Sequence, residues 1–152
     1  MKNTLFLLCA VAICLLGCKS SQKVAQNEVI SSKDPPSEAF LLAQQQLEAY
    51  NKRDLEAFLF PFSDSVKVYK QHTLSYEGKD NMREGYAGWF GSLDSLHCTV
   101  LQRISEGNTV IDHERIYYKR KNGESSTYHT IAIYTIKNGK IQEVIFPKIS
   151  WQ

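Results

Sequence analysis

The sequence has few cysteines, few prolines and no strong excess of charge of one sign. Its 152 residues contain four cysteines and four prolines, and the formal net charge is +2 at pH 7. A charge this close to zero gives no reason to expect nucleic acid or an acidic membrane surface as a partner. Three of the cysteines lie at or before Cys18, so Cys98 has no partner for an internal disulfide once that segment is removed. We expect Cys98 to be a small buried hydrophobic side chain on a strand.

Long apolar runs are absent except at the N-terminus. The run LFLLCAVAICLLG begins shortly after Lys2 and ends at Gly17, next to Cys18. It is too short to span a bilayer comfortably and has the layout of a secretory signal. The ending LLGC resembles the bacterial lipoprotein signal, in which the cysteine is lipidated and becomes the new N-terminus. Residues 1–17 are therefore predicted to be a lipoprotein signal peptide and Cys18 the lipidation site; an ordinary signal peptide with a chance cysteine is the alternative.

A polar segment follows. Residues 18–36 include KSSQKVAQNEVISSKDPP, have no sustained hydrophobic period and are predicted to be a lipidated tether. Lys19 is not the acidic residue that is associated with inner-membrane retention in some bacteria. The expected location is therefore the cell envelope, on the periplasmic face of the outer membrane, with the membrane as partner through the lipid anchor. Loss of residues 1–17 removes only one charged side chain, Lys2, and residues 37–150 are enough for one domain.

Three helices are expected in the first half of this domain. Ser37 can cap a helix whose apolar positions are spaced by three or four residues, as on a single helical face: Phe40, Ala43, Leu47 and Tyr50. Asp54 can cap a second, short helix with Leu55, Phe58, Leu59 and Phe62, which Pro61 interrupts. Asp80 can cap a third helix with Met82, Tyr86, Trp89 and Phe90 on one face.

Strands make up the rest of the pattern. VKVYK alternates after the second helix, and four strand-like segments follow the third: LHCTVLQRIS, TVIDHERIYYK, STYHTIAIYTI and KIQEVIFPKI. Glu106 to Asn108 and Lys137 to Gly139 are typical hairpin turns. Helices segregated from antiparallel strands predict an α+β domain, with a strongly curved antiparallel sheet wrapped over the first helix.

The order of these pieces resembles the SnoaL-like branch of the nuclear transport factor 2-like superfamily. The resemblance rests on the first helix, then AYNKRDLEAFLFPFSDSVKVY, YEGKDNMREGYAGWF and paired strands ending in IKNGKI, over residues 37 to 148. It implies a cone-shaped, cystatin-like α+β fold with an apolar cavity, and a homodimer formed through the outer face of the sheet. Members include ketosteroid isomerases, polyketide cyclases, dehydratases and many proteins without demonstrated activity, so the fold does not decide the function.

The resemblance also locates the positions that ketosteroid isomerases use for catalysis. Counting from Asn51, their oxyanion-donating tyrosine falls at Gln46 and their general-base aspartate at Lys70. Counting back from Gly139, their protonated aspartate falls near Ala132. None of the three carries the required group, because this chemistry needs a carboxylate to move the proton and acidic donors to hold the enolate. No catalytic residue is therefore assigned.

The segment DHER, from Asp112 to Arg115, could supply another acid or base. If Leu96, Cys98, Val100 and Ile104 face inward, a two-residue turn at Glu106 to Asn108 puts His113 and Arg115 inward and Asp112 outward, opposite Arg103. A three-residue turn reverses this and points Asp112 and Glu114 inward. The first arrangement is favoured, because it pairs opposite charges on the outer face.

Histidines offer no clear site. We take Tyr128, Thr130, Ala132 and Tyr134 as inward-facing because Ala132 is so by the resemblance, which turns His129 outward. His72 and His97 are isolated in the sequence, and no histidine pair has metal-ligand spacing. We therefore expect no metal site and no cofactor.

Aromatic residues are the positive signal for a ligand-binding cavity, although most of them belong to an ordinary core. The predicted ligand-binding residues combine such side chains with two polar ones: Gln46, Tyr50, Lys70, Tyr86, Trp89 and Tyr128. An inward lysine would suit a carboxylate or phenolate, so the expected ligand is a small apolar or anionic molecule. The sequence favours a non-catalytic binding or accessory domain over a SnoaL-like isomerase, cyclase or dehydratase. A third alternative is a filled cone that acts only through the outer face of its sheet, where Thr127, Ile131, Ile133 and Thr135 would lie.

Overall fold

The computed structural model describes residues 35–149. The predicted signal peptide, most of the predicted tether, the lipidation site Cys18 and the last residue of the predicted domain, residue 150, lie outside the described residues. The described elements are, in order, α1 (Glu38–Lys52), α2 (Leu55–Leu59), β1 (Phe62–Lys70), β2 (Thr73–Glu77), α3 (Lys79–Ser92), β3 (Leu93–Glu106), β4 (Thr109–Arg120), β5 (Ser125–Lys137) and β6 (Lys140–Phe146). Within residues 35–149, no helix combines the length and the apolar character needed to cross a membrane.

The first two helices begin at the predicted caps. The Ser37 hydroxyl accepts a hydrogen bond from the backbone N–H of Phe40 at 3.1 Å, and the Asp54 carboxylate accepts one from Ala57 at 3.1 Å. Arg53 adopts a left-handed conformation with φ of 56° and ends α1. These local signals place α1 and α2 at nearly the predicted residues.

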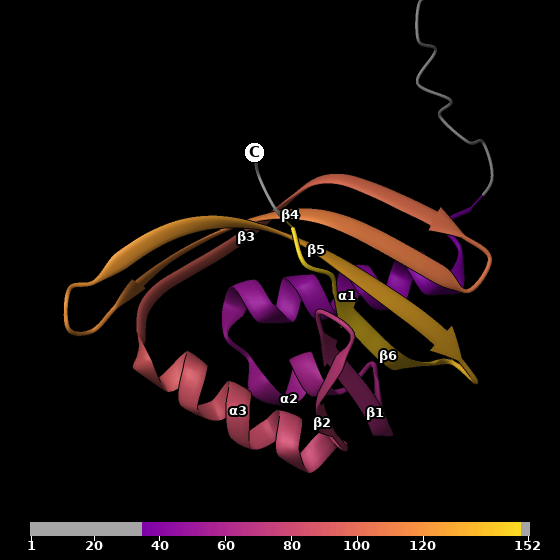
Figure 1. Ribbon diagram of the computed structural model, residues 1–152, viewed down its shortest axis with the longest axis horizontal. Coiled ribbons are helices and arrows are strands. Elements are labelled where there is room, and N and C mark those ends of the chain that lie inside the picture. The colour runs from indigo at the N-terminus through magenta and orange to yellow at the C-terminus, as the bar shows by residue number, and fades with distance from the viewer. Residues whose placement is uncertain (1–34, 150–152) are drawn as a thin grey trace, which may run out of the picture. The chain divides into compact units, whose positions relative to one another are not determined.

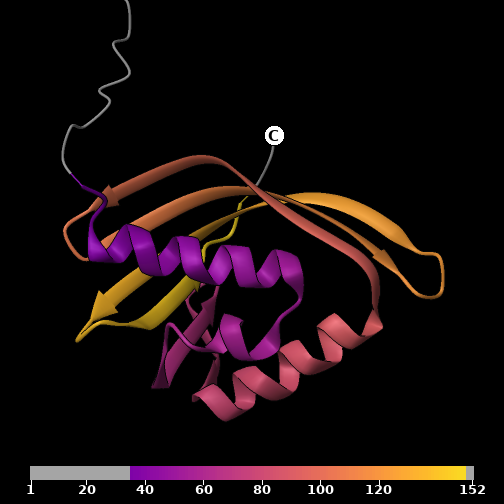
Figure 2. The same cartoon turned by 180° about the vertical axis from the view of Figure 1, so that it is seen from behind.

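The six strands form one curved sheet in the order β2-β1-β6-β5-β4-β3. Figure 1 shows β3, β4 and β5 arching over α1, and Figure 2 shows the same arch from behind, with α3 below α1. The α+β cone is thus confirmed, but the sheet is mixed, because β1 runs parallel to β6 while the other neighbours are antiparallel. The prediction of a purely antiparallel sheet is wrong for this pair. No hairpin joins β1 to β6, so the connection does not impose the antiparallel direction.

Two local predictions were also wrong, and one strand was not predicted. Thr73–Glu77 forms the edge strand β2, a short and mostly exposed strand that the sequence interpretation does not include. The third helix begins after Gly78, and Asp80 lies in its first turn without capping it. Phe62 opens β1 and does not continue α2, which ends at Leu59, before Pro61.

Both predicted hairpins form, with two residues in each turn. Glu106 lies opposite Thr109, and Lys137 lies opposite Lys140. In the second turn, Asn138 and Gly139 have φ of 54° and 68°, the left-handed values that a tight hairpin turn requires at both central positions.

A β-bulge in β3 changes which side chains face the helices. The pairing of β3 with β4 shifts between Val100 and Gln102, where Leu101 is an additional residue. Because alternate residues of a strand face opposite sides, one additional residue exchanges the faces beyond it. Arg103 therefore lies on the inner face, and Ile104, which we expected there, is 54% exposed.

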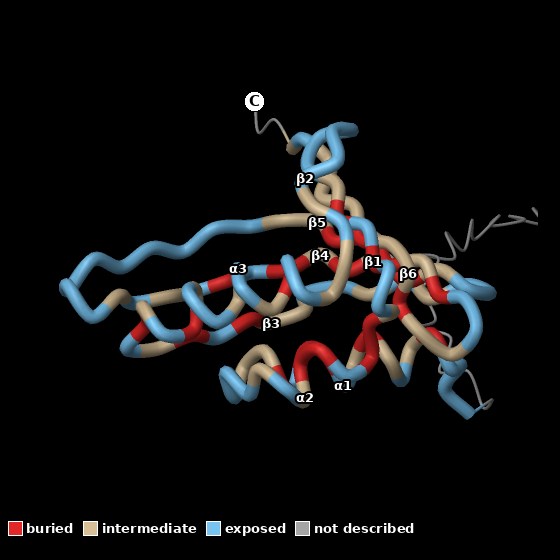
Figure 3. Tube along the Cα trace, turned by 90° about the horizontal axis from the view of Figure 1, so that it is seen from below, coloured by how far each residue is buried: buried red, intermediate tan, exposed pale blue. Residues whose placement is uncertain are grey.

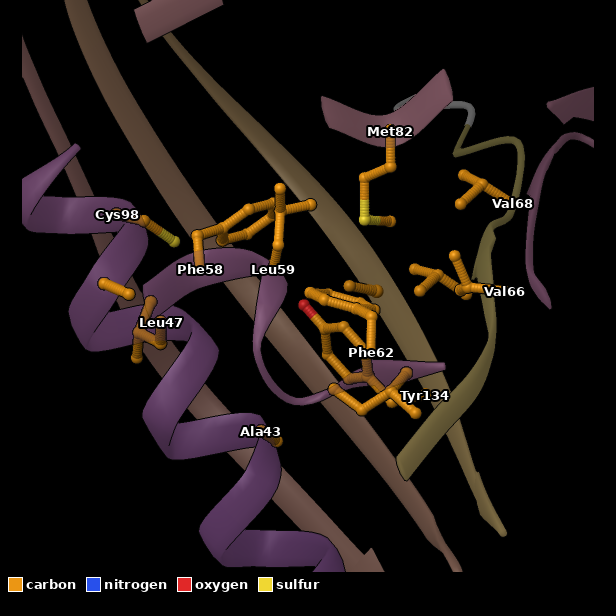
Figure 4. Close-up of a cluster of buried hydrophobic side chains, with 14 of the residues drawn as sticks. Ala43, Leu47, Phe58, Leu59, Phe62, Val66, Val68, Met82, Cys98 and Tyr134 are labelled. Atoms are coloured by element: carbon orange, nitrogen blue, oxygen red, sulfur yellow. The ribbon is translucent and has the colours of Figure 1, made fainter. Parts of the chain in front are cut away.

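The core lies between α1 and the inner face of the sheet. Figure 3 shows the buried positions in red along α1 and the sheet, and the β4–β5 hairpin as largely exposed. In Figure 4, Phe58, Phe62 and Tyr134 pack together between α1 and β1, with Met82 above them. Cys98 is buried on β3, as predicted.

Candidate functional site

A cavity of about 540 Å³ opens inside the cone, between α1, α3 and the inner face of the sheet. Aromatic side chains contribute much of its wall, among them Tyr50, Phe58, Tyr86, Trp89, Tyr128 and Tyr134. A cavity with mainly apolar walls and a few polar groups is the usual form of a small-molecule site.

All six predicted ligand-binding residues line this cavity. Gln46 and Tyr50 come from α1, Lys70 from the end of β1, Tyr86 and Trp89 from α3, and Tyr128 from β5. The helical residues meet there because their spacing of three or four residues places them on one face of their helix. The structure brings the six residues together, and their binding of a ligand stays a prediction.

Glu114 also lines the cavity, whereas the favoured interpretation of the sequence places it on the outer face of the sheet. It is only 5% exposed and lies opposite Val100 on the inner face. We expected Asp112 and Glu114 to face outward after a two-residue turn. The turn has the predicted length, but the Leu101 bulge exchanges the faces of β3, so both carboxylates point inward.

A hydrogen-bonded chain connects Glu114 to α1. The Tyr134 hydroxyl donates to Glu114 Oε1 at 3.2 Å and accepts from Gln46 Nε2 at 3.1 Å. The pKa of Glu114 is raised to about 7, first by burial and then by the negative charge of Asp112, while the Tyr134 hydrogen bond and the Arg103 charge act in the opposite direction. This carboxyl group can therefore give up or accept a proton near neutral pH.

The second buried carboxylate is already paired. Arg103 Nε and Nη2 donate to the two oxygens of Asp112, each at 2.7 Å, and Arg103 Nη1 donates to Gln44 at 3.0 Å. The predicted partnership of Arg103 with Asp112 is thus confirmed, but the pair lies inside the cone, where Asp112 is fully buried. A bidentate pair of this kind partly offsets the charge of Asp112 and occupies the guanidinium group whose charge also acts on Glu114.

Tyrosine hydroxyls supply neutral donors around Glu114. Burial raises the pKa of Tyr128 to about 12 and raises those of Tyr50, Tyr86 and Tyr134 further. Burial likewise raises the pKa of the Cys98 thiol, which lies in the same wall. These groups stay protonated at neutral pH, so they can donate hydrogen bonds to a ligand oxygen.

The family model of the SnoaL-like domain matches residues 43–144. The chain belongs to this family. No curated protein matches the sequence significantly.

Solved structures share the fold of this SnoaL-like domain. A cystatin-fold protein from Novosphingobium aromaticivorans is 19% identical with a TM-score of 0.66, over 75% of this chain and 100% of that chain. A putative SnoaL-like polyketide cyclase from Jannaschia sp. CCS1 is 12% identical with a TM-score of 0.64, over 74% of this chain and 89% of that chain. AclR from Streptomyces galilaeus, a putative hydroxylase, is 16% identical with a TM-score of 0.64, over 72% of this chain and 77% of that chain. Identities this low establish the fold alone.

The positions inferred from ketosteroid isomerases can now be located in the SnoaL-like domain. Gln46 is buried and reaches Tyr134, Lys70 is exposed at the rim of the cavity, and Ala132 is buried on the inner face. The group with matching chemistry is Glu114, on a different strand. One signal could have located Glu114. Every second residue of β4 lies on the same face, and this face carries Val110, Asp112, Glu114 and Ile116. Ala132, which the resemblance places inward, lies opposite Asp112, so this face of β4 points inward as well.

Histidines lie outside the cavity wall. His129 points outward, as predicted, and its Nδ1 lies 3.3 Å from Nε2 of His113 on the neighbouring strand. His72 and His97 are exposed. Among residues 35–149, no three His, Cys, Asp or Glu side chains are grouped as a metal site would require.

Proposed function

We propose that this domain binds a small, largely apolar molecule in the cone and that Glu114 exchanges a proton with it. The observation that carries the proposal is the position of Glu114, a buried carboxyl group hydrogen-bonded to Tyr134 in the wall of an aromatic cavity. A carboxyl group with a pKa near the working pH is a suitable general acid or base. The favoured function is therefore acid/base chemistry of the isomerase, cyclase or dehydratase kind.

Such reactions share a step that these residues could perform. Glu114 in its carboxylate form would take a proton from a carbon next to a carbonyl group, and the electron pair of that C–H bond would move onto the carbonyl oxygen. Neutral tyrosine hydroxyls in the wall, such as Tyr128, could donate to that oxygen as negative charge develops. Glu114 would then return the proton to another atom of the same molecule, so no further reactant is needed.

Non-catalytic binding is the second candidate. It is favoured by Gln46, Lys70 and Ala132, which lack the groups that a ketosteroid isomerase needs at those positions. Both candidates use the same cavity and differ in whether Glu114 acts on the ligand. An anchor at Cys18 would hold either kind of domain in the cell envelope, and the motif LLGC supports that location.

A direct test uses 5-nitrobenzisoxazole, a small aromatic compound whose ring opens when a desolvated base removes its carbon-bound proton. The purified protein is expected to accelerate this reaction, with a rate that increases as the pH rises through about 7. Glu114→Gln should lower the rate at least about 100-fold, the usual minimum contribution of a positioned general base. Glu124→Gln, at an exposed position, is the matched control.

Blocking the cavity provides an independent check of where the reaction occurs. Gly85 of α3 lines the cavity, and a Cβ atom there would meet no atom within 4 Å, so Gly85→Leu can place its side chain in the empty space. Gly88→Leu on the same helix also meets no atom at Cβ, and Gly88 is not a wall residue. The proposal requires that only the first leucine slows the reaction. Equal rates in wild type and Glu114→Gln would refute catalysis by Glu114 and leave the non-catalytic candidate.

A further inference from the structure

Glu114 introduces a negative charge that the deep part of the cavity does not balance. Among the described residues, the hydrogen bond to its carboxylate comes from the neutral Tyr134 hydroxyl. The nearby cation, Arg103, is held by both oxygens of Asp112 and by Gln44. An ionised carboxylate in such a place is costly unless a positive charge joins it.

The walls around Glu114 suit an organic cation. Tyr50, Tyr86 and Phe58 pack against one another, with ring centroids of Tyr50 and Tyr86 6.2 Å apart and those of Phe58 and Tyr86 4.3 Å apart. Trp89 donates its indole N–H to the Tyr50 hydroxyl at 3.2 Å, which holds these two rings together. The faces of Trp and Tyr rings attract cations, and the attraction grows as water is excluded.

Among the described residues, Lys70 is the cationic side chain in the cavity wall and argues for an anion, but its position weakens that argument. It is exposed at the rim, where water and salt screen its charge. Glu114 is buried, where the effective dielectric constant is lower and a charge acts more strongly. The buried carboxylate therefore contributes more to the choice of ligand than the exposed ammonium group.

We propose that the molecule bound in this cavity carries a positive charge, as an amine or quaternary ammonium group, and that this group lies against Glu114 among the aromatic rings. The inference rests on the proposed function because it names the class of substrate for the same cavity. A bound cation stabilises the carboxylate form of Glu114, which is the form that accepts a proton. The cavity of about 540 Å³ leaves room for a ring system attached to the charged group.

The experiment compares three probes of similar shape and different charge: phenyltrimethylammonium, its neutral carbon analogue tert-butylbenzene, and the anion 4-tert-butylbenzoate. Binding is measured by calorimetry or by NMR chemical shifts between pH 5.5 and 8. The ammonium probe should bind more tightly as the pH rises through about 7, and Glu114→Gln should weaken it at least about 10-fold, the equivalent of 1.4 kcal/mol. The neutral analogue should respond to neither change, and its retained binding shows that the variant keeps an intact cavity.

Several groups surround Glu114, and only Glu114 should account for the pH dependence. The charged groups around it are Asp112 on β4 and Arg103 on β3, with Lys70 at the rim. The other titratable groups are neutral donors: Cys98 on β3, Tyr128 and Tyr134 on β5, Tyr50 on α1 and Tyr86 on α3. The tyrosines and Cys98 have raised pKa values and stay neutral over this range. The ammonium probe does not titrate, and Glu124→Gln again serves as the control.

Either of two results would overturn the inference: an affinity for the ammonium probe that Glu114→Gln leaves unchanged, or tighter binding of the benzoate that Lys70→Met abolishes. Failure here is distinguishable from failure of the proposed function. Loss of benzisoxazole ring opening in Glu114→Gln, together with unchanged ammonium binding, would support the general base and reject the cationic substrate.

Discussion

Glu114 also links the site to the stability of the domain. Its pKa is about 7 in the folded protein and 4.5 in an exposed reference state, so the folded state holds this proton more tightly. The group therefore favours the folded state at low pH, and this contribution is lost as the pH rises from about 4.5 through 7. A shift of this size corresponds to at most about 3 kcal/mol.

The first prediction concerns this loss of folding stability as the pH rises. The free energy of unfolding of wild type, minus that of Glu114→Gln, should fall by up to about 3 kcal/mol between pH 4 and pH 8. Urea unfolding at a series of pH values measures it. Glu56 and Asp64, whose pKa values are lowered by Arg83 and Lys79, favour the folded state at higher pH, but they are common to both proteins and cancel in the difference. A difference that does not change with pH would mean that Glu114 is not desolvated in solution.

At the scale of elements, the bulge accommodates Leu101 as one additional residue of β3, so that Arg103 and Asp112 lie on the same inner face as Val100 and Glu114. The register on its two sides is continuous once Leu101 is left out: Val100 lies opposite Glu114, Gln102 opposite His113 and Arg103 opposite Asp112. Deleting Leu101 should therefore keep every pair and every inward side chain, and should remove only the local bend.

A deletion series tests this second prediction. The variant without Leu101 should fold cooperatively and lose no more than about 3 kcal/mol, the range of ordinary single changes. Deleting Arg115 from the middle of β4, a strand paired on both sides, should prevent folding because it turns half of the strand inside out. Circular dichroism and urea unfolding report both effects. If the Leu101 deletion is as damaging as the Arg115 deletion, the bulge is indispensable to the curvature of the sheet.

The same bulge explains how far the sequence could predict the site. Helical spacing, caps and hairpin turns act locally, so they located α1, the two hairpins and the inward faces of α1 and α3, which carry Tyr50, Tyr86 and Trp89. The inward face of β4 depends on one additional residue in a neighbouring strand, and no local pattern at Leu101 marks it. β2 and the parallel pairing of β1 with β6 were missed for a similar reason, because contacts distant in sequence determine them.

At the scale of the whole domain, the outer face of the sheet carries apolar side chains. Ile133 on β5 lies beside Ile111 on β4 and Ile145 on β6, and all three are partly exposed on the side away from the helices. The family resemblance predicts a homodimer that uses this face. A contiguous apolar area on an open sheet is typical of an interaction surface.

The third prediction is that the purified domain is a dimer and that Ile133→Lys makes it a monomer. Two lysines brought together in an apolar interface would be buried without partners, and each carries a cost of several kcal/mol. Glu84→Lys, at an exposed position of α3 on the other side of the domain, should leave the dimer intact. Sedimentation velocity distinguishes the two states, and circular dichroism verifies that both variants are folded. A wild-type monomer, or a dimer that survives Ile133→Lys, would exclude this face as the interface. Because the cavity opens on the opposite side of the sheet, the folded monomeric variant should still bind tert-butylbenzene like wild type.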